Sequence, residues 1–151
     1  MREKPAKVLL IEENPQDARL IWDMLSDDRF GGFEVEVVNQ PSSGITRLKQ
    51  GKTDAVLLDI TSLNSEELER FFKANRSVGA PPVLVLTASE NEKTAVKALH
   101  LGAHHYLRKD FLPPNLLKHC LEYAIEHNKS EQKLNERVKA VSYTHLTLPT
   151  N

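Results

Sequence analysis

The sequence predicts a doubly wound α/β fold, in which helices cover both faces of a parallel sheet. Two observations predict it. Short apolar runs alternate along the chain with longer amphipathic stretches, and three of the runs, 8–11, 56–58 and 83–86, are apolar at every position. Such strands are typical of the centre of a parallel sheet, where both faces are buried. A chain of 151 residues is long enough for one such domain with a single core.

The elements follow from local patterns. The first strand, 8–11, precedes an amphipathic stretch over 15–28 whose apolar residues recur at helical spacing. Asn14 and Pro15 are typical of an N-cap and of the first helical position. The double glycine that follows ends this helix. Residues 33–37 alternate apolar and charged side chains, which favours an edge strand with one solvated face.

The last helix is predicted to run from Pro114 to beyond Lys139. Over 26 residues it would span about 39 Å, more than the roughly 30 Å of a small domain. Its second half must therefore project. We assign residues 1–127 to the domain and the polar stretch that follows, 128–140, to a linker helix toward an output domain.

One face of this helix carries a seam with spacings of three and four, diluted by a histidine and a glutamate. Its members are Leu117, Cys120, Ala124, His127, Glu131, Leu134 and Val138. This spacing predicts a linker helix or a weak two-stranded coil, and so a possible homodimer through the C-terminal helix.

The final stretch, 141–151, breaks the polar helical pattern. Residues 141–150 match the translation of GTC TCT TAT ACA CAT CTG ACG CTG CCG ACG, which resembles a transposase adapter from shotgun DNA libraries. We expect this stretch to be an artefact that packs on nothing, and the natural chain to continue into a further domain.

Composition excludes several classes of function. The net charge of -1 and a pI near 6.6 provide no electrostatic footprint for direct binding to nucleic acid or anionic membrane. No apolar run approaches the roughly 20 residues that a membrane span needs. The single cysteine, Cys120, cannot form an internal disulfide. We therefore expect a cytoplasmic protein with a reduced thiol.

Four of the apolar runs end beside polar residues. The acids Glu12 and Glu13 follow the first, Asp59 ends the third, and Thr87 and Lys109 follow the fourth and fifth. The carboxyl ends of parallel strands open onto one crevice, where such folds bind ligands. The set fits a carboxylate that accepts a phosphoryl group on a divalent cation, with the hydroxyl and the ammonium holding the phosphoryl oxygens.

With these residues in this order, the chain resembles the receiver domain of bacterial two-component response regulators over roughly residues 6–127. The motifs are Glu12-Glu13-Asn14, Leu57-Leu58-Asp59, Leu86-Thr87-Ala88 and Gly102-Ala103-His104-His105-Tyr106-Leu107-Arg108-Lys109. The resemblance implies a flavodoxin-like sheet with strand order 2-1-3-4-5. It also implies a signalling protein rather than an enzyme, with only self-phosphotransfer and slow autodephosphorylation.

The resemblance assigns roles to individual residues. Asp59 would take a phosphoryl group from a histidine kinase or a histidine phosphotransfer protein. Thr87 and Lys109 would bind the phosphoryl oxygens, and Tyr106 would be the switch aromatic. Mg²⁺, or Mn²⁺ in its place, would be held by Glu12, Glu13, Asp59 and the backbone carbonyl of Thr61.

The chain departs from the family at four positions. Glu13 stands where an aspartate is usual, and its extra methylene adds about 1.5 Å of reach. Asp110 replaces a proline after the lysine, Leu63 replaces a proline, and Glu67 replaces a glycine.

These departures leave two alternatives open. One is a degenerate receiver that takes no phosphoryl group and acts as a phosphorylation-independent interaction module. The other, more distant, is an aspartate-nucleophile phosphatase, although Thr61 stands where that chemistry uses a second aspartate.

Overall fold

The computed structural model describes residues 5–27, 32–88, 92–110 and 112–141, with side chains up to residue 128. In these ranges strands and helices alternate: β1 (Lys7–Ile11), α1 (Pro15–Ser26), β2 (Glu34–Val38), α2 (Pro41–Leu48), β3 (Ala55–Asp59), α3 (Ser65–Ser77), β4 (Val83–Thr87), α4 (Glu92–Leu101), β5 (His105–Arg108) and α5 (Pro114–Val141). All neighbouring strands are parallel and their order is β2-β1-β3-β4-β5. The predicted fold class and strand order are confirmed.

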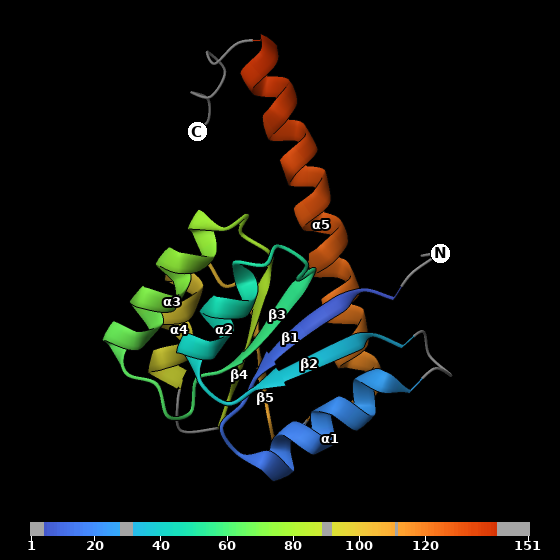
Figure 1. Ribbon diagram of the computed structural model, residues 1–151, viewed down its shortest axis with the longest axis vertical. Helices are drawn as coiled ribbons and strands as arrows, with labels where there is room; N and C mark the ends of the chain where they lie inside the picture. The colour runs from blue at the N-terminus through green and yellow to red at the C-terminus, as the bar shows by residue number, and fades with distance from the viewer. Residues whose placement is uncertain (1–4, 28–31, 89–91, 111, 142–151) are drawn as a thin grey trace.

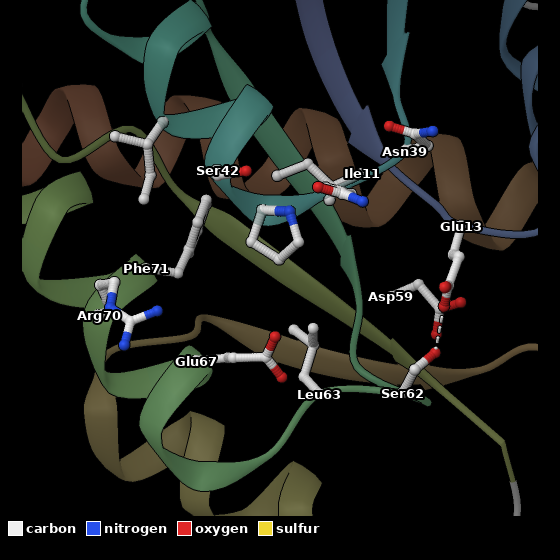
Figure 2. A pocket seen from close by; sticks show the side chains of 13 residues that line it. Ile11, Glu13, Asn39, Ser42, Asp59, Ser62, Leu63, Glu67, Arg70 and Phe71 are labelled. Atoms are coloured by element: carbon white, nitrogen blue, oxygen red, sulfur yellow. Dashed lines mark hydrogen bonds between the residues drawn. The ribbon is translucent and has the colours of Figure 1, made fainter.

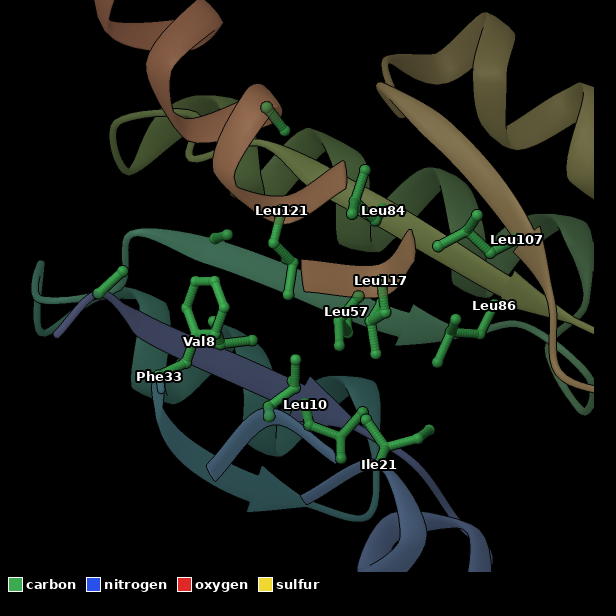
Figure 3. Close-up of a cluster of buried hydrophobic side chains, with 14 of the residues drawn as sticks. Val8, Leu10, Ile21, Phe33, Leu57, Leu84, Leu86, Leu107, Leu117 and Leu121 are labelled. Atoms are coloured by element: carbon green, nitrogen blue, oxygen red, sulfur yellow. The ribbon is translucent and has the colours of Figure 1, made fainter. Parts of the chain in front are cut away.

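The molecule has three layers (Figure 1). Helices α1 and α5 cover one face of the sheet, and α2, α3 and α4 cover the other. Because side chains alternate between faces along a strand, each central strand supplies both cores. On β3, for example, Leu57 packs toward α5, whereas Val56 and Leu58 pack toward α3. Figure 3 shows the first of these cores, formed around leucines of β1, β3, β4 and α5.

Strand register brings the ends of the strands to one edge. Ile11 pairs with Leu58, so the residue after β1 lies beside Asp59 at the end of β3. Thr87 pairs with Arg108, so the residue after β5 lies next to the end of β4. Backbone pairing alone therefore gathers the polar residues that follow these strands.

Helix α1 begins at this edge because Asn14 caps it. The Asn14 side chain accepts hydrogen bonds from the backbone N–H groups of Gln16 and Asp17, at 2.8 and 3.2 Å. Pro15 supplies the fixed φ of the first helical position. The predicted cap is confirmed, and it directs the first turn of α1 toward the strand ends.

Helix α5 contains 28 residues and is therefore about 42 Å long. Its early turns pack on the sheet, and its later turns extend beyond it (Figure 1). By Asn128 it has reached the opposite edge, where it lines a hollow with Thr53 and Asp54, just before β3.

The predicted seam on α5 needs a correction. Leu117 and Ala124 are buried in the domain's own core, so this part of the seam is not free to meet another chain. A homodimer through α5 therefore remains a prediction only for the turns after residue 127. Residues 142–151, the greater part of the suspected adapter stretch, lie outside the described residues.

Candidate functional site

Asp59, the last residue of β3, has a side chain only 6% exposed, and both of its oxygens have partners. Oδ1 accepts hydrogen bonds from the backbone N–H and the hydroxyl of Thr61, at 3.0 and 2.7 Å. Oδ2 accepts one from the Lys109 ammonium at 2.9 Å. Burial alone would raise the pKa of Asp59, but hydrogen bonds with Glu12, Thr61 and Lys109 outweigh it and hold the pKa below its ordinary value. The carboxylate is therefore ionised near neutral pH.

Lys109 lies among three carboxylates. Its Nζ is 2.6 Å from Oδ2 of Asp17, 2.9 Å from Oδ2 of Asp59 and 3.1 Å from Oε1 of Glu12. Its backbone N–H donates to the Thr87 carbonyl at 2.9 Å, which places it beside β4. Burial would lower the pKa of this ammonium, but the hydrogen bonds with Asp17, Asp59 and Glu12 raise it well above its usual range. The lysine is a permanent cation in this site.

Glu12 is almost fully buried at 2% exposure. Its Oε2 accepts a hydrogen bond from the Asn14 backbone N–H at 3.1 Å, whereas Oε1 receives no properly directed hydrogen bond from a described group. Burial and the neighbouring Asp59 carboxylate raise the pKa of Glu12 to about 7. Two acidic groups thus share a space that one ammonium only partly neutralises.

Glu13 is directed differently. Its Oε1 accepts a hydrogen bond from the Ser62 hydroxyl at 2.6 Å. Figure 2 shows this pair beside Asp59 at one end of a cleft, with Glu67 and Arg70 at the other. The cleft, about 320 Å³ in volume, lies between α2 and α3, and Asp59 is one of the residues that line it.

The donor chemistry of the site fits Mg²⁺. Glu12, Glu13 and Asp59 offer oxygen atoms only, which is what this hard cation prefers. A divalent cation would also relieve the repulsion from Asp59 that, together with burial, raises the pKa of Glu12. In the part of the chain that the structure describes, however, no group of three acidic, histidine or cysteine side chains is placed to hold a metal ion. Glu13 directs one oxygen, Oε1, to Ser62.

Thr87 and Tyr106 lie on the neighbouring strands β4 and β5. Thr87 is buried, and its hydroxyl donates to the Ala88 carbonyl at 2.9 Å. Tyr106, half-buried, packs against the core under α3 and α4. Val85, two residues before Thr87, pairs with Tyr106, so the hydroxyl and the ring are diagonal neighbours on the α4 side. The switch role of Tyr106 stays a prediction.

Two contacting residues were missed in the sequence. Asp17, in the first turn of α1, touches Lys109, and Ser62, after β3, touches Glu13. Asp17 could have been predicted from the sequence, because it lies three residues after the N-cap Asn14, and this N-cap follows the acidic pair. An acid in that first helical turn lies near the strand ends. No sequence feature predicted Ser62.

The departures from the family have structural roles. Glu67 forms a capping box with Asn64 at the start of α3, through hydrogen bonds of 2.9 and 3.0 Å. Asp110 makes an ion pair with Arg108 at 2.9 Å on the surface. Leu63 packs against the core under α2 and α3. None of the three displaces Asp59 or Lys109.

This fold, with an acidic residue after β1, an aspartate ending β3 and a lysine after β5, defines a class of signalling domains. The sequence matches the response regulator receiver domain family over residues 8–121, and the chain belongs to that family. Receiver domains interact with histidine kinases and generally bind Mg²⁺ at the phosphorylation site.

Individual response regulators are also similar to the chain in sequence. The chain is 27% identical over 113 residues to the DNA-binding response regulator MtrA of Mycolicibacterium smegmatis, covering 74% of this chain and 47% of MtrA. It is 31% identical over 104 residues to the KDP operon transcriptional regulatory protein KdpE of Escherichia coli, covering 69% and 44%. The chain thus spans about half the length of these relatives.

The fold also matches solved structures. A CheY-like response regulator receiver domain protein from Methanospirillum hungatei superposes with a TM-score of 0.69 at 20% identity, covering 85% of this chain and 99% of that one. Among the described residues, no helix is long and apolar enough to cross a membrane.

Proposed function

We propose that this domain accepts a phosphoryl group on Asp59 and relays a signal by the change in structure that follows. The observation that carries the proposal is the state of Asp59: an ionised carboxylate at the edge of the sheet, held by Lys109 at 2.9 Å and lining a cleft. A carboxylate becomes an effective nucleophile toward phosphorus when nearby cations neutralise the incoming oxygens.

The chemistry is a transfer between two proteins. An Asp59 carboxylate oxygen forms a bond to phosphorus, while the bond between phosphorus and the imidazole nitrogen of a donor phosphohistidine breaks. The electron pair of that bond returns to the imidazole, so atoms and charges balance. The donor would be a histidine kinase or a histidine phosphotransfer protein.

Mg²⁺ would be held by Glu12, Glu13, Asp59 and the backbone carbonyl of Thr61, with Mn²⁺ an alternative. When bound, it would neutralise charge on the phosphoryl oxygens. The chain's own share of this task falls to Lys109, whose ammonium is already beside the acceptor oxygen. Beyond self-phosphotransfer and slow autodephosphorylation, we expect no enzymatic activity.

Two side chains, those of Lys109 and Thr87, would bind the phosphoryl group. A hydrogen bond to a charged group contributes about 1.5–3 kcal/mol, and shifting a two-state equilibrium from 1:99 to 99:1 takes about 5.5 kcal/mol. Contacts from Lys109 and Thr87 together would contribute just enough free energy for such a shift. Because Thr87 shares a sheet face with Tyr106, a movement of the hydroxyl toward the phosphoryl group would open space for the ring.

The test is incubation with acetyl phosphate and Mg²⁺, followed by intact mass. The parent should gain the mass of one phosphoryl group and Asp59→Asn should not, because an amide cannot form an acyl phosphate. Asp54→Asn is the matched control, because Asp54 precedes the same strand and its carboxylate binds only the Lys7 backbone N–H in the hydrogen bonds described for it. Phosphorylated Asp59→Asn would refute the assignment.

A degenerate receiver is the second candidate, and the Glu13–Ser62 hydrogen bond favours it because that contact occupies one oxygen of a proposed metal ligand. It predicts that the parent also gains no phosphoryl mass. A phosphatase is disfavoured, because Thr61 replaces the aspartate that it needs and its hydroxyl donates to Asp59.

A further inference from the structure

Asp17 makes the shortest of the three contacts to the Lys109 ammonium, at 2.6 Å. The distances to Asp59 and Glu12 are 2.9 and 3.1 Å. Its side chain is 36% exposed, and that of Lys109 is 17% exposed. Neither the phosphotransfer step nor metal binding, as described above, uses Asp17.

The position of Asp17 is fixed by its own helix. Its backbone N–H donates to the Asn14 side chain at 3.2 Å, so the residue belongs to a capped first turn. The positive end of the helix dipole favours a carboxylate there. Asp17 is therefore a rigid acceptor on α1 that faces the end of β5.

The charges at this edge are unbalanced. Three carboxylates, those of Glu12, Asp17 and Asp59, contact one ammonium. A lysine has three N–H donors. A donor given to Asp17 is withdrawn from the Asp59 side, where a phosphoryl group would add about two negative charges.

We propose that Asp17 is a positioning residue, which holds the Lys109 ammonium between α1 and Asp59 and competes for it with a phosphoryl group on Asp59. The inference rests on the proposed function. Asp17 thereby lowers the extent of phosphorylation that a given donor concentration produces. Removing its charge frees the ammonium for the phosphoryl oxygens and reduces repulsion toward an anionic donor.

The experiment compares Asp17→Asn with Asp23→Asn, a control on the same helix. Asp23 pairs with Arg19 at 3.5 Å on the surface. At fixed acetyl phosphate and Mg²⁺, the ratio of phosphorylated to unphosphorylated protein should rise ~3- to 10-fold in Asp17→Asn, since Asp17 is partly exposed and its charge partly screened. Asp23→Asn should match the parent, and Asp17→Glu, which keeps the charge, should restore the parent's ratio.

A second readout needs no phosphorylation. In metal-free protein with nitrogen-15 lysine, the Lys109 ammonium should produce a signal protected from exchange with water. The signal should weaken in Asp17→Asn and persist in Asp23→Asn. A signal unchanged by Asp17→Asn would overturn the positioning role.

The two proposals fail in different ways. A parent that gains no phosphoryl mass would overturn the proposed function, and the competition with it. A parent that is phosphorylated to the same ratio as Asp17→Asn would overturn the competition alone. If Asp17→Asn unfolds, Asp17→Ser with the same two readouts decides the matter.

Discussion

The Nζ atom of Lys109 lies 2.9 Å from Oδ2 of Asp59, although their strands, β5 and β3, are separated by β4. The lysine follows β5 and reaches past the end of β4, to which its backbone N–H is bonded. A cation is therefore in place at the acceptor before any phosphoryl group arrives.

Replacing that cation should separate phosphorylation from the response to it. We expect Lys109→Ala to accept some phosphoryl group from acetyl phosphate, with Mg²⁺ as the remaining cation, but to show a blunted conformational change, because the ammonium also binds the phosphoryl oxygens after transfer. The measurement is the amide spectrum around Thr87 and Tyr106 before and after phosphorylation. Lys97→Ala is the control, since Lys97 pairs with Glu69 on the surface. Equal spectral changes in phosphorylated Lys109→Ala and parent would rule out this role.

The protonation of Glu12 should make stability depend on pH. Burial and Asp59 raise its pKa from an ordinary 4.5 to about 7, so the folded state binds this proton more tightly than the unfolded state. Its contribution is fully present below about pH 4.5 and is lost as pH rises through about 7. Glu12→Gln has no proton to lose at this position. Without metal, the unfolding free energy of the variant should therefore rise by roughly 1–3 kcal/mol relative to that of the parent as the pH goes from 5 to 8.

Urea unfolding with a chelator at the two pH values measures this difference. Glu66→Gln, on the first turn of α3 and exposed, should keep the parent's dependence. The same pH dependence in parent and Glu12→Gln would show that the Glu12 carboxyl is ionised in the folded protein throughout this range.

The sequence predicted the parts of the site that depend on strand order. Glu12, Asp59 and Lys109 lie at the ends of apolar runs. Parallel pairing brings the backbones at these ends together, whichever way the side chains point. The fold follows from the same alternation of apolar runs and amphipathic stretches.

What the sequence did not predict depends on side-chain direction. Glu13 points to Ser62 rather than to Glu12, a choice of rotamer that spacing cannot reveal. The partner of Asp17 depends on how α1 is rotated against the sheet. The seam proposed on α5 failed at Leu117 for a related reason, since an apolar stripe does not specify whether its partner is the domain's own sheet or another chain.

Glu13→Asp should tighten Mg²⁺ binding several-fold. The shorter side chain matches the usual family acid and can no longer keep the 2.6 Å hydrogen bond with Ser62 in place. Ser62→Ala should also tighten binding, because it releases Glu13 without shortening it. Calorimetric titration of Mg²⁺ into the metal-free protein measures both. Weaker binding in Glu13→Asp would mean that the site is built around glutamate.

Two adjacent leucines test how α5 docks. Leu117 is fully buried among the core leucines, whereas Leu116, about 100° around the helix, is 45% exposed. Leu117→Ala should cost about 2–5 kcal/mol of unfolding free energy through lost burial and the cavity left behind, and Leu116→Ala should cost under about 1 kcal/mol. Urea unfolding of both variants compares them on one helix with one substitution. Equal losses would mean that α5 lies on the sheet with a different face, and the seam after residue 127 would then have to be reassigned as well.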